Sequence, residues 1–141
     1  MRVRCVREYP SEEQIAHLGP NFYRNQSFPI TVGKEYLVLG IETYNNSVAY
    51  GTCVGIQYKT DDGNLLSTPI ILFEITDPRV SNYWEARITD DGGLLLWPTA
   101  FYREYYHDDL SSGVPEVMKD FNYVYDLLDK EYNEGAEQLE G

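Results

Sequence analysis

The spacing of apolar residues changes once along the chain, at Pro98, and this change limits the folds that the sequence can adopt. Between residues 34 and 97, apolar side chains alternate with polar or small ones, which is typical of β-strands. After residue 114 they recur every three or four positions, as on an amphipathic helix. Because no helix separates successive strands, the pattern predicts antiparallel strands followed by a helix in a mainly β, α+β domain.

Five strands are predicted, at residues 34–42, 48–58, 69–76, 83–89 and 94–97. The second strand places Gly51 and Gly55 on one face, and such small residues imply that another part of the protein approaches closely. Trp84, Ala86 and Ile88 alternate in the fourth strand and are expected to point inward. Short strands joined by tight turns predict a five-stranded antiparallel SH3-like barrel or a strongly bent sheet.

Helices are predicted at residues 11–18, 99–108 and 114–132. The last is an amphipathic C-terminal helix in which Val117, Phe121 and Leu128 share the apolar face, and Pro115 suits its first turn. With 141 residues in all, the chain has the length of one domain, which we expect to comprise residues 1–132. Residues 133–141 lack an apolar face and are predicted to form a disordered acidic tail.

The negative charge of the chain is concentrated near its C-terminus. The net charge is -12, and the eleven carboxylates from Glu104 onward are opposed there only by Lys119 and Lys130. Such a chain repels phosphate backbones, so direct binding to nucleic acid is not expected. A localised negative charge instead attracts basic proteins.

Few residues suggest catalysis or a bound cofactor. His17 and His107 are the only histidines, and Cys5 and Cys53 are far apart in sequence, so no metal site is expected. The sequence contains no GxSxG, Walker or GxGxxG motif. We therefore expect neither a cofactor nor enzyme activity, while the sequence alone leaves a Cys53–His107 pair open.

The sequence also predicts where the protein resides. No stretch approaches the eighteen apolar residues of a membrane-spanning helix, and the N-terminal MRVRCVREYPSEE lacks the apolar run of a signal peptide. We expect a cytoplasmic protein that does not insert into a membrane and whose cysteines are reduced.

Residues 101–110, FYREYYHDDL, combine aromatic rings with carboxylates. Phe101 and Tyr105 would share a helical face and are expected to close the core. The remaining tyrosines are expected at the surface, because rigid rings beside carboxylates suit the recognition of arginine and lysine on another protein. The predicted partner-binding residues are Tyr102, Glu104, Tyr106, Asp108, Asp109 and Asp126, and the predicted partner is a basic protein.

Several segments together resemble a known kind of protein. They are VGKEY at residues 32–36, FEITDPR at residues 73–79, and Trp97-Pro98 ahead of an acidic helix. They resemble small bacterial proteins with an SH3-like barrel, including immunity proteins encoded beside polymorphic or contact-delivered toxins. The resemblance implies an inhibitor of a toxic enzyme, often a basic nuclease, whose active site the acidic protein covers. It carries over no catalytic residue, because those proteins act by occlusion.

Two other functions fit the same sequence. The chain could be a ligand-binding barrel or small enzyme whose tyrosines line a pocket, and a cavity containing Tyr50, Tyr58 or His107 would favour that reading. It could also be a structural or regulatory subunit of a phage or secretion assembly, which self-association would favour. The sequence leaves the oligomeric state open.

Overall fold

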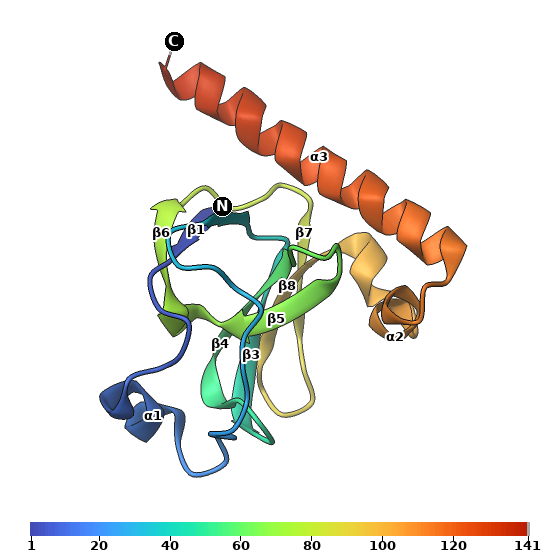
Figure 1. The fold of residues 1–141 in the computed structure, drawn as a ribbon. Helices are drawn as coiled ribbons and strands as arrows, with labels where there is room; N and C mark the ends of the chain where they lie inside the picture. The colour runs from blue at the N-terminus through green and yellow to red at the C-terminus, as the bar shows by residue number, and fades with distance from the viewer. Residues whose placement is uncertain (141) are drawn as a thin grey trace.

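The structure is a computed structural model that describes the backbone of residues 1–140 and the side chains of residues 1–135 (Figure 1). This part of the chain forms the strands β1 (Arg2–Cys5), β2 (Glu35–Leu37), β3 (Gly40–Ser47), β4 (Gly51–Lys59), β5 (Leu65–Pro69), β6 (Phe73–Asp77), β7 (Trp84–Ile88) and β8 (Leu94–Pro98). It also forms the helices α1 (Glu12–Leu18), α2 (Tyr106–Ser111) and α3 (Pro115–Glu140), with short 3-10 helices η1 (Ile70–Leu72) and η2 (Thr99–Tyr102). The predicted mainly β, α+β class with a C-terminal helix is confirmed.

The strands pair antiparallel in two sheets. The larger sheet has the order β5-β4-β3-β8-β7, and the smaller has the order β2-β1-β6. The predicted strand 34–42 is interrupted at Val38 and Leu39, so it enters the smaller sheet as β2 and the larger one as β3. Within residues 1–140 the strands do not close into a barrel, because β5 and β7 remain at opposite edges of the larger sheet.

Sequence reasoning missed two strands, β1 and β5. β1 pairs with both β2 and β6 at the centre of the smaller sheet, and Val3 and Cys5 point into the core. Its four residues alternate arginine with an apolar residue, which is too short a run to establish a period of two. β5 follows the turn at residues 60–64 and pairs with β4 at one edge of the larger sheet.

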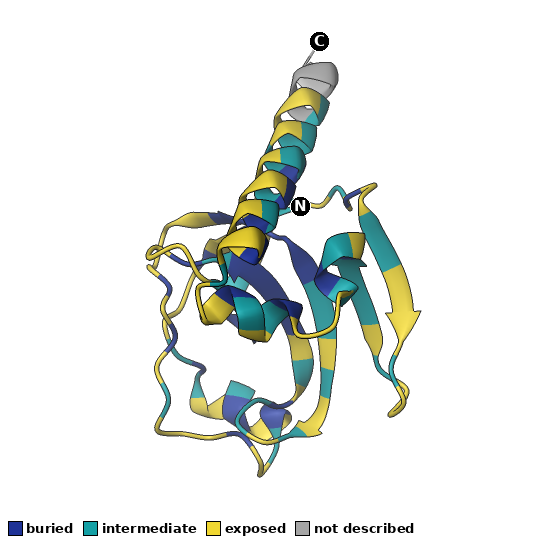
Figure 2. Cartoon of the chain, turned by 90° about the vertical axis from the view of Figure 1, so that its right-hand side faces the viewer, coloured by how far each residue is buried: buried dark blue, intermediate teal, exposed yellow. Residues whose placement is uncertain are grey.

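Two apolar clusters hold these layers together. The first lies between the two sheets and includes Val3, Tyr36, Ile56 and Leu72. The second packs α3 against β2, the β2–β3 connection, η2 and α2, with Leu65 and Trp97 of the larger sheet at its margin. Figure 2 shows the buried residues of α3 on the side that faces the sheets. The two clusters meet at the β2–β3 connection, where Val38 belongs to the first and Leu39 to the second.

The close approach predicted at the glycines of β4 is confirmed. A Cβ atom at Gly51 would collide with the backbone of Leu18, and one at Gly55 would collide with the ring of Tyr44. The predicted inward face of β7 is wrong in its second half, where Ile88 is 81% exposed. β7 is an edge strand, so only its first half reaches the core, where Trp84 donates its ring N–H to the carbonyl of Leu39 at 3.0 Å.

The first helix and the start of the last one agree with the sequence. The predicted helix 11–18 forms as α1. A capping box between Ser11 and Gln14 stabilises its N-terminus. α3 begins at Pro115, one residue after the predicted start at residue 114, but it continues to Glu140 where a disordered tail was expected. Alanine, glutamate, glutamine and leucine in this stretch favour a helix even without an apolar face to bury. Residue 141 lies outside the described residues.

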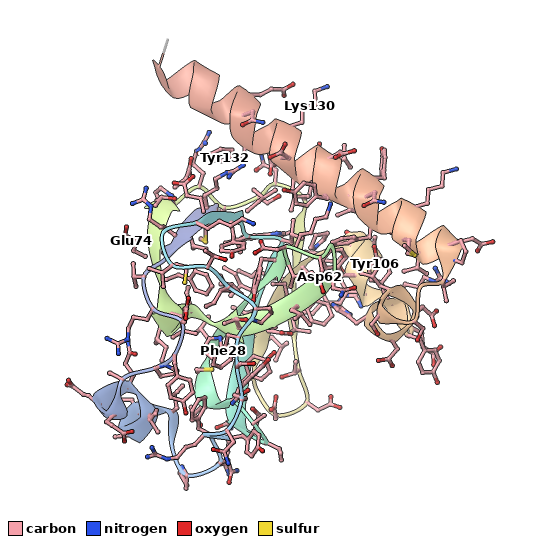
Figure 3. All side chains as sticks on the ribbon, in the orientation of Figure 1. Phe28, Asp62, Glu74, Tyr106, Lys130 and Tyr132 are labelled. Atoms are coloured by element: carbon pink, nitrogen blue, oxygen red, sulfur yellow. The ribbon has the colours of Figure 1, made fainter. Side chains whose placement is uncertain are left out.

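Tyr132 holds this extension of α3 near the sheets. Figure 3 shows Tyr132 on the side of α3 that faces the sheets and Lys130 on the outer side. The guanidinium groups of Arg2 and Arg79 lie 4.6 and 5.1 Å from the centre of the Tyr132 ring. Arg79 also donates to the Tyr132 carbonyl at 3.1 Å. In residues 1–140, no helix combines the length and the apolar content needed to cross a membrane.

The predicted helix 99–108 is instead divided between η2 and α2. Tyr105, at the start of α2, has a φ angle of 62°, in the left-handed region that helical residues avoid. This break rotates the second half of the segment, so Tyr106 is only 1% exposed whereas Tyr105 is 66% exposed. Phe101 is buried as predicted, but the predictions for Tyr105 and Tyr106 were reversed.

Replacing Tyr106 with alanine is expected to lower the free energy of unfolding by about 3–5 kcal/mol, because it empties a large buried site. The same replacement at Tyr105 removes an exposed ring and should change that free energy by no more than about 0.5 kcal/mol. Urea unfolding of the two variants measures both values. Equal losses would contradict the assignment of Tyr106, and not Tyr105, to the core.

Candidate functional site: the acidic surface and the cleft beside α2

Tyr106, a predicted partner-binding residue, belongs to the core. Its ring stacks on Phe101 with 5.1 Å between centroids, and its hydroxyl donates to a carboxylate oxygen of Asp120 at 2.9 Å. Burial, and then the hydrogen bond to Asp120, raise the pKa of Tyr106 above its ordinary value. Figure 3 shows this side chain beneath α3. Tyr106 therefore positions α2 against α3 and does not present its ring to a partner.

Tyr102 is half-buried and fixed against the larger sheet. Its hydroxyl donates to the backbone carbonyl of Glu85 at 2.6 Å, and its ring stacks on Trp97 with centroids 5.0 Å apart. The Arg87 guanidinium lies 3.9 Å from the centre of the same ring. Tyr102 therefore packs on the larger sheet and does not project toward a partner. Arg87 already occupies the position over its ring that a partner's cation would take.

The predicted carboxylates do lie at the surface. Glu104 and Asp108 are exposed and Asp109 is half-buried, all within a short segment at the start of α2. Asp126 is exposed on α3. Tyr105 directly follows Glu104 in the sequence. It supplies the exposed ring that was expected from Tyr106. We call Glu104, Tyr105, Asp108, Asp109 and Asp126 the acidic surface.

Ion pairs neutralise most carboxylates of the smaller sheet but few of those in α2 and α3. Among the described side chains, Arg2 and Arg4 bind Glu35, and Arg4 also binds Glu74. In α2 and α3, and in the turn before α2, only Asp129 and Glu134 have a basic partner within residues 1–135. The carboxylates there without one are Glu104, Asp108, Asp109, Glu116, Asp120, Asp126 and Glu131. Residues 104–131 therefore hold seven of the thirteen carboxylates in residues 1–135 that have no basic partner.

A cleft of about 240 Å³ opens beside α2, next to the acidic surface. It is lined by Glu42, Gln57, Leu65, Leu66, Ser67, Trp97 and His107, which come from β3, β4, β5, β8 and α2. None of these residues except His107 was considered as a site residue from the sequence. Gln57 lies on the same face of β4 as the small residues of that strand. A polar residue on this face could have indicated the cleft from the sequence.

Glu42 lies at the centre of a hydrogen-bonded chain in this cleft. Its carboxylate accepts from the Tyr44 hydroxyl at 2.6 Å and from the side-chain amide of Gln57 at 3.3 Å. The amide oxygen of Gln57 is 3.4 Å from Nε2 of His107. Gln57 is only 2% exposed, so the chain of bonds fixes the orientation of its amide.

The two glycines of the sheet make room for this arrangement. Gly55 lies directly across from Glu42 in the β3–β4 ladder, and the Tyr44 ring occupies the space above it. Gly40 lies across from Gln57, and a Cβ atom there would be 3.0 Å from the Trp97 ring. A larger residue at either position would displace a ring that shapes the cleft.

The negative charge of Glu42 acts on several neighbours. Burial, and then the negative charge of Glu42, raise the pKa of the Cys53 thiol to about 11. Burial lowers the pKa of His107, against the opposing effect of Glu42 and Asp108. Cys53 bonds weakly to the Tyr50 carbonyl at 3.7 Å, and His107 faces Gln57, so the two residues do not form the pair that the sequence left open. Among the described side chains, no three potential ligands gather as a metal site would require.

His107 should make stability depend on pH. Its folded-state pKa lies below the ordinary value of about 6.5, so the unfolded chain binds the proton more readily. The stability supplied by neutral His107 is therefore complete above about pH 6.5 and is lost as the pH falls toward the folded-state pKa. His107→Gln, which does not titrate, should lose less free energy of unfolding than the wild type between about pH 7.5 and 5. Urea unfolding at several pH values checks this, and parallel curves would contradict it.

Comparisons of the chain with known protein families, with curated proteins and with solved structures give no match. The candidate site is therefore defined by its own chemistry. It consists of an exposed acidic surface on α2 and α3 and of a polar cleft that begins where His107 meets the sheet.

Proposed function

We propose that this chain is a protein-binding module whose acidic surface binds a basic protein. The observation that carries the proposal is the distribution of ion pairs. Seven carboxylates at residues 104–131 have no basic partner within the described side chains, whereas the basic residues of the smaller sheet are paired. A surface with this excess attracts cationic macromolecules and gains free energy when lysines or arginines approach it.

Tyr105 supports the same proposal. A non-glycine residue in the left-handed region costs roughly 1–2 kcal/mol, and the surrounding structure has to offset that cost. The strained backbone holds the Tyr105 ring outward while Tyr106 is held inside. An exposed rigid ring surrounded by carboxylates is the combination that protein interfaces use as an anchor.

The mode of action that fits best is inhibition by occlusion. In this proposal the chain is an immunity protein in the cytoplasm, and its partner is a basic toxin, such as a nuclease, encoded beside it. Binding places the acidic surface over the cationic active site, which prevents nucleic acid from entering. The chain supplies charge and shape and carries out no reaction of its own.

The direct test is to mix the chain with the products of neighbouring genes and to measure binding by calorimetry. A stoichiometric complex with a basic product, at an affinity of about 1 μM or tighter, is expected. Inhibition of that product's enzymatic activity at an equal molar ratio would assign the toxin role. Binding weaker than this to every neighbouring product would contradict the proposal.

Charge reversal at the acidic surface should slow association. The double variant Glu104→Lys with Asp108→Lys is expected to lower the association rate constant about tenfold or more at low ionic strength, because it removes the steering charge. The difference should nearly vanish at about 1 M salt, where the Debye length is about 3 Å. Stopped-flow mixing measures both rates.

The matched control is Glu8→Lys with Glu13→Lys. It changes the net charge by the same amount at two exposed positions in and beside α1, away from α2 (Figure 1). Thermal unfolding of both variants verifies that they remain folded. If the control slows association as much as the test variant does, only net charge matters and the acidic surface is not the docking site.

A further inference from the structure

We propose that the cleft beside α2 is a recognition pocket for one guanidinium group, supplied by an arginine side chain of the basic partner. This inference rests on the proposed function, because it names the group that the partner would insert. It concerns residues of the larger sheet that lie outside the acidic surface.

Glu42 is a carboxylate that has only neutral partners. It accepts from Tyr44 and Gln57, and no basic side chain lies within 4.0 Å of it among the described residues. Each carboxylate oxygen can accept a further hydrogen bond. A half-buried carboxylate without a cation is a costly arrangement, and a guanidinium that donates to both oxygens would offset that cost.

The walls of the cleft suit a flat cation. The rings of Trp97 and His107 pack against each other with centroids 4.8 Å apart, and both line the cleft together with Glu42. A guanidinium packs well on such rings, whereas an ammonium is a compact point charge that stays more strongly hydrated. Because burial lowers the pKa of His107, the imidazole adds no opposing positive charge near neutral pH.

The cleft is small for a ligand site. Its volume is about 240 Å³, which is below the range of about 300–1,000 Å³ typical of small-molecule sites. A single side chain or a group of that size fills such a space. Leu65 and Leu66 also line the cleft and would contact the methylene groups of an inserted arginine.

Charge repulsion favours an arginine within a peptide over the free amino acid. Free arginine would bring a carboxylate next to Asp108 and Glu42, whose charges repel it, while an arginine within a chain brings none.

The location of the cleft agrees with this occupant. His107, which lines it, is followed directly by Asp108 of the acidic surface. A protein that docks on the acidic surface therefore has the cleft within reach of a long side chain. In this arrangement the acidic surface attracts the partner, and the cleft selects the position of one arginine.

The test uses a capped Gly-Arg-Gly peptide as the probe. We expect it to shift the indole N–H signal of Trp97 in ¹H–¹⁵N NMR spectra, with saturation at a dissociation constant of about 1 mM, typical of a single anchored group. The capped Gly-Cit-Gly peptide, in which citrulline replaces arginine with a neutral group of the same shape, should bind at least tenfold more weakly. Trp84→Phe assigns the two indole signals.

Two variants and a second probe complete the design. Glu42→Gln should weaken binding of the arginine peptide at least tenfold, whereas Glu13→Gln, an equivalent change on α1, should leave it unaltered. Free L-arginine should bind more weakly than the capped peptide. If it binds tenfold better, the pocket serves a small molecule and the assignment to a protein side chain is wrong.

The outcomes separate this inference from the proposed function. If the arginine and citrulline peptides shift Trp97 equally, or if neither does at about 10 mM, the pocket does not recognise a guanidinium; this comparison needs no variant of the cleft. If Glu42→Gln leaves the affinity for a basic partner unchanged while Glu104→Lys with Asp108→Lys slows its association, the acidic surface is functional and the arginine pocket is refuted.

Discussion

The packing of Phe101 and Tyr106 against Phe121 determines which side chains the C-terminal third of the chain exposes. The ring centroids of Phe101 lie 5.1 Å from those of Tyr106 and 6.3 Å from those of Phe121, so η2, α2 and α3 share one aromatic cluster. Phe101 and Tyr106 are thus buried on either side of a short turn, in which Arg103, Glu104 and Tyr105 are exposed. Glu104 and Tyr105 occupy that turn. The acidic surface is therefore a consequence of how α2 is anchored, and its position depends on core packing.

The polar cleft has a different origin, in the surface of the larger sheet. Gly40 and Gly55 leave gaps among the side chains of β3 and β4, and the rings of Trp97 and Tyr44 cover them. Between these rings a carboxylate and an amide remain partly enclosed and bonded to each other. The anchoring of α2 in the core and the gaps at Gly40 and Gly55 are two different features of the fold. Together they place the acidic residues of α2 next to the cleft that contains Glu42. Both features favour a cationic partner, and neither requires that the chain be an enzyme.

Much of the fold could be predicted because local spacing was enough. The capping box of α1, the apolar face of α3 and the glycines of β4 all carry their information within a few residues. The interruption at Tyr105 had no such signal, since tyrosine seldom adopts a left-handed backbone, and without it the buried and exposed rings are assigned in reverse. The cleft was not predictable either, because its residues come from four strands and one helix that only tertiary packing brings together. Total charge was evident from the sequence, but which carboxylates lack partners depends on ion pairs such as Arg2 with Asp129, 127 positions apart.

We propose that a basic protein binds on the α2 side of this molecule. Hydrogen exchange of the chain, measured by mass spectrometry with and without a saturating basic partner, tests it most directly because it reports every backbone segment at once. We expect slower exchange at residues 104–111 and in the neighbouring β4–β5 hairpin, with little change in α1. Slower exchange confined to α1 or to the β7–β8 hairpin, with residues 104–111 unaffected, would contradict it.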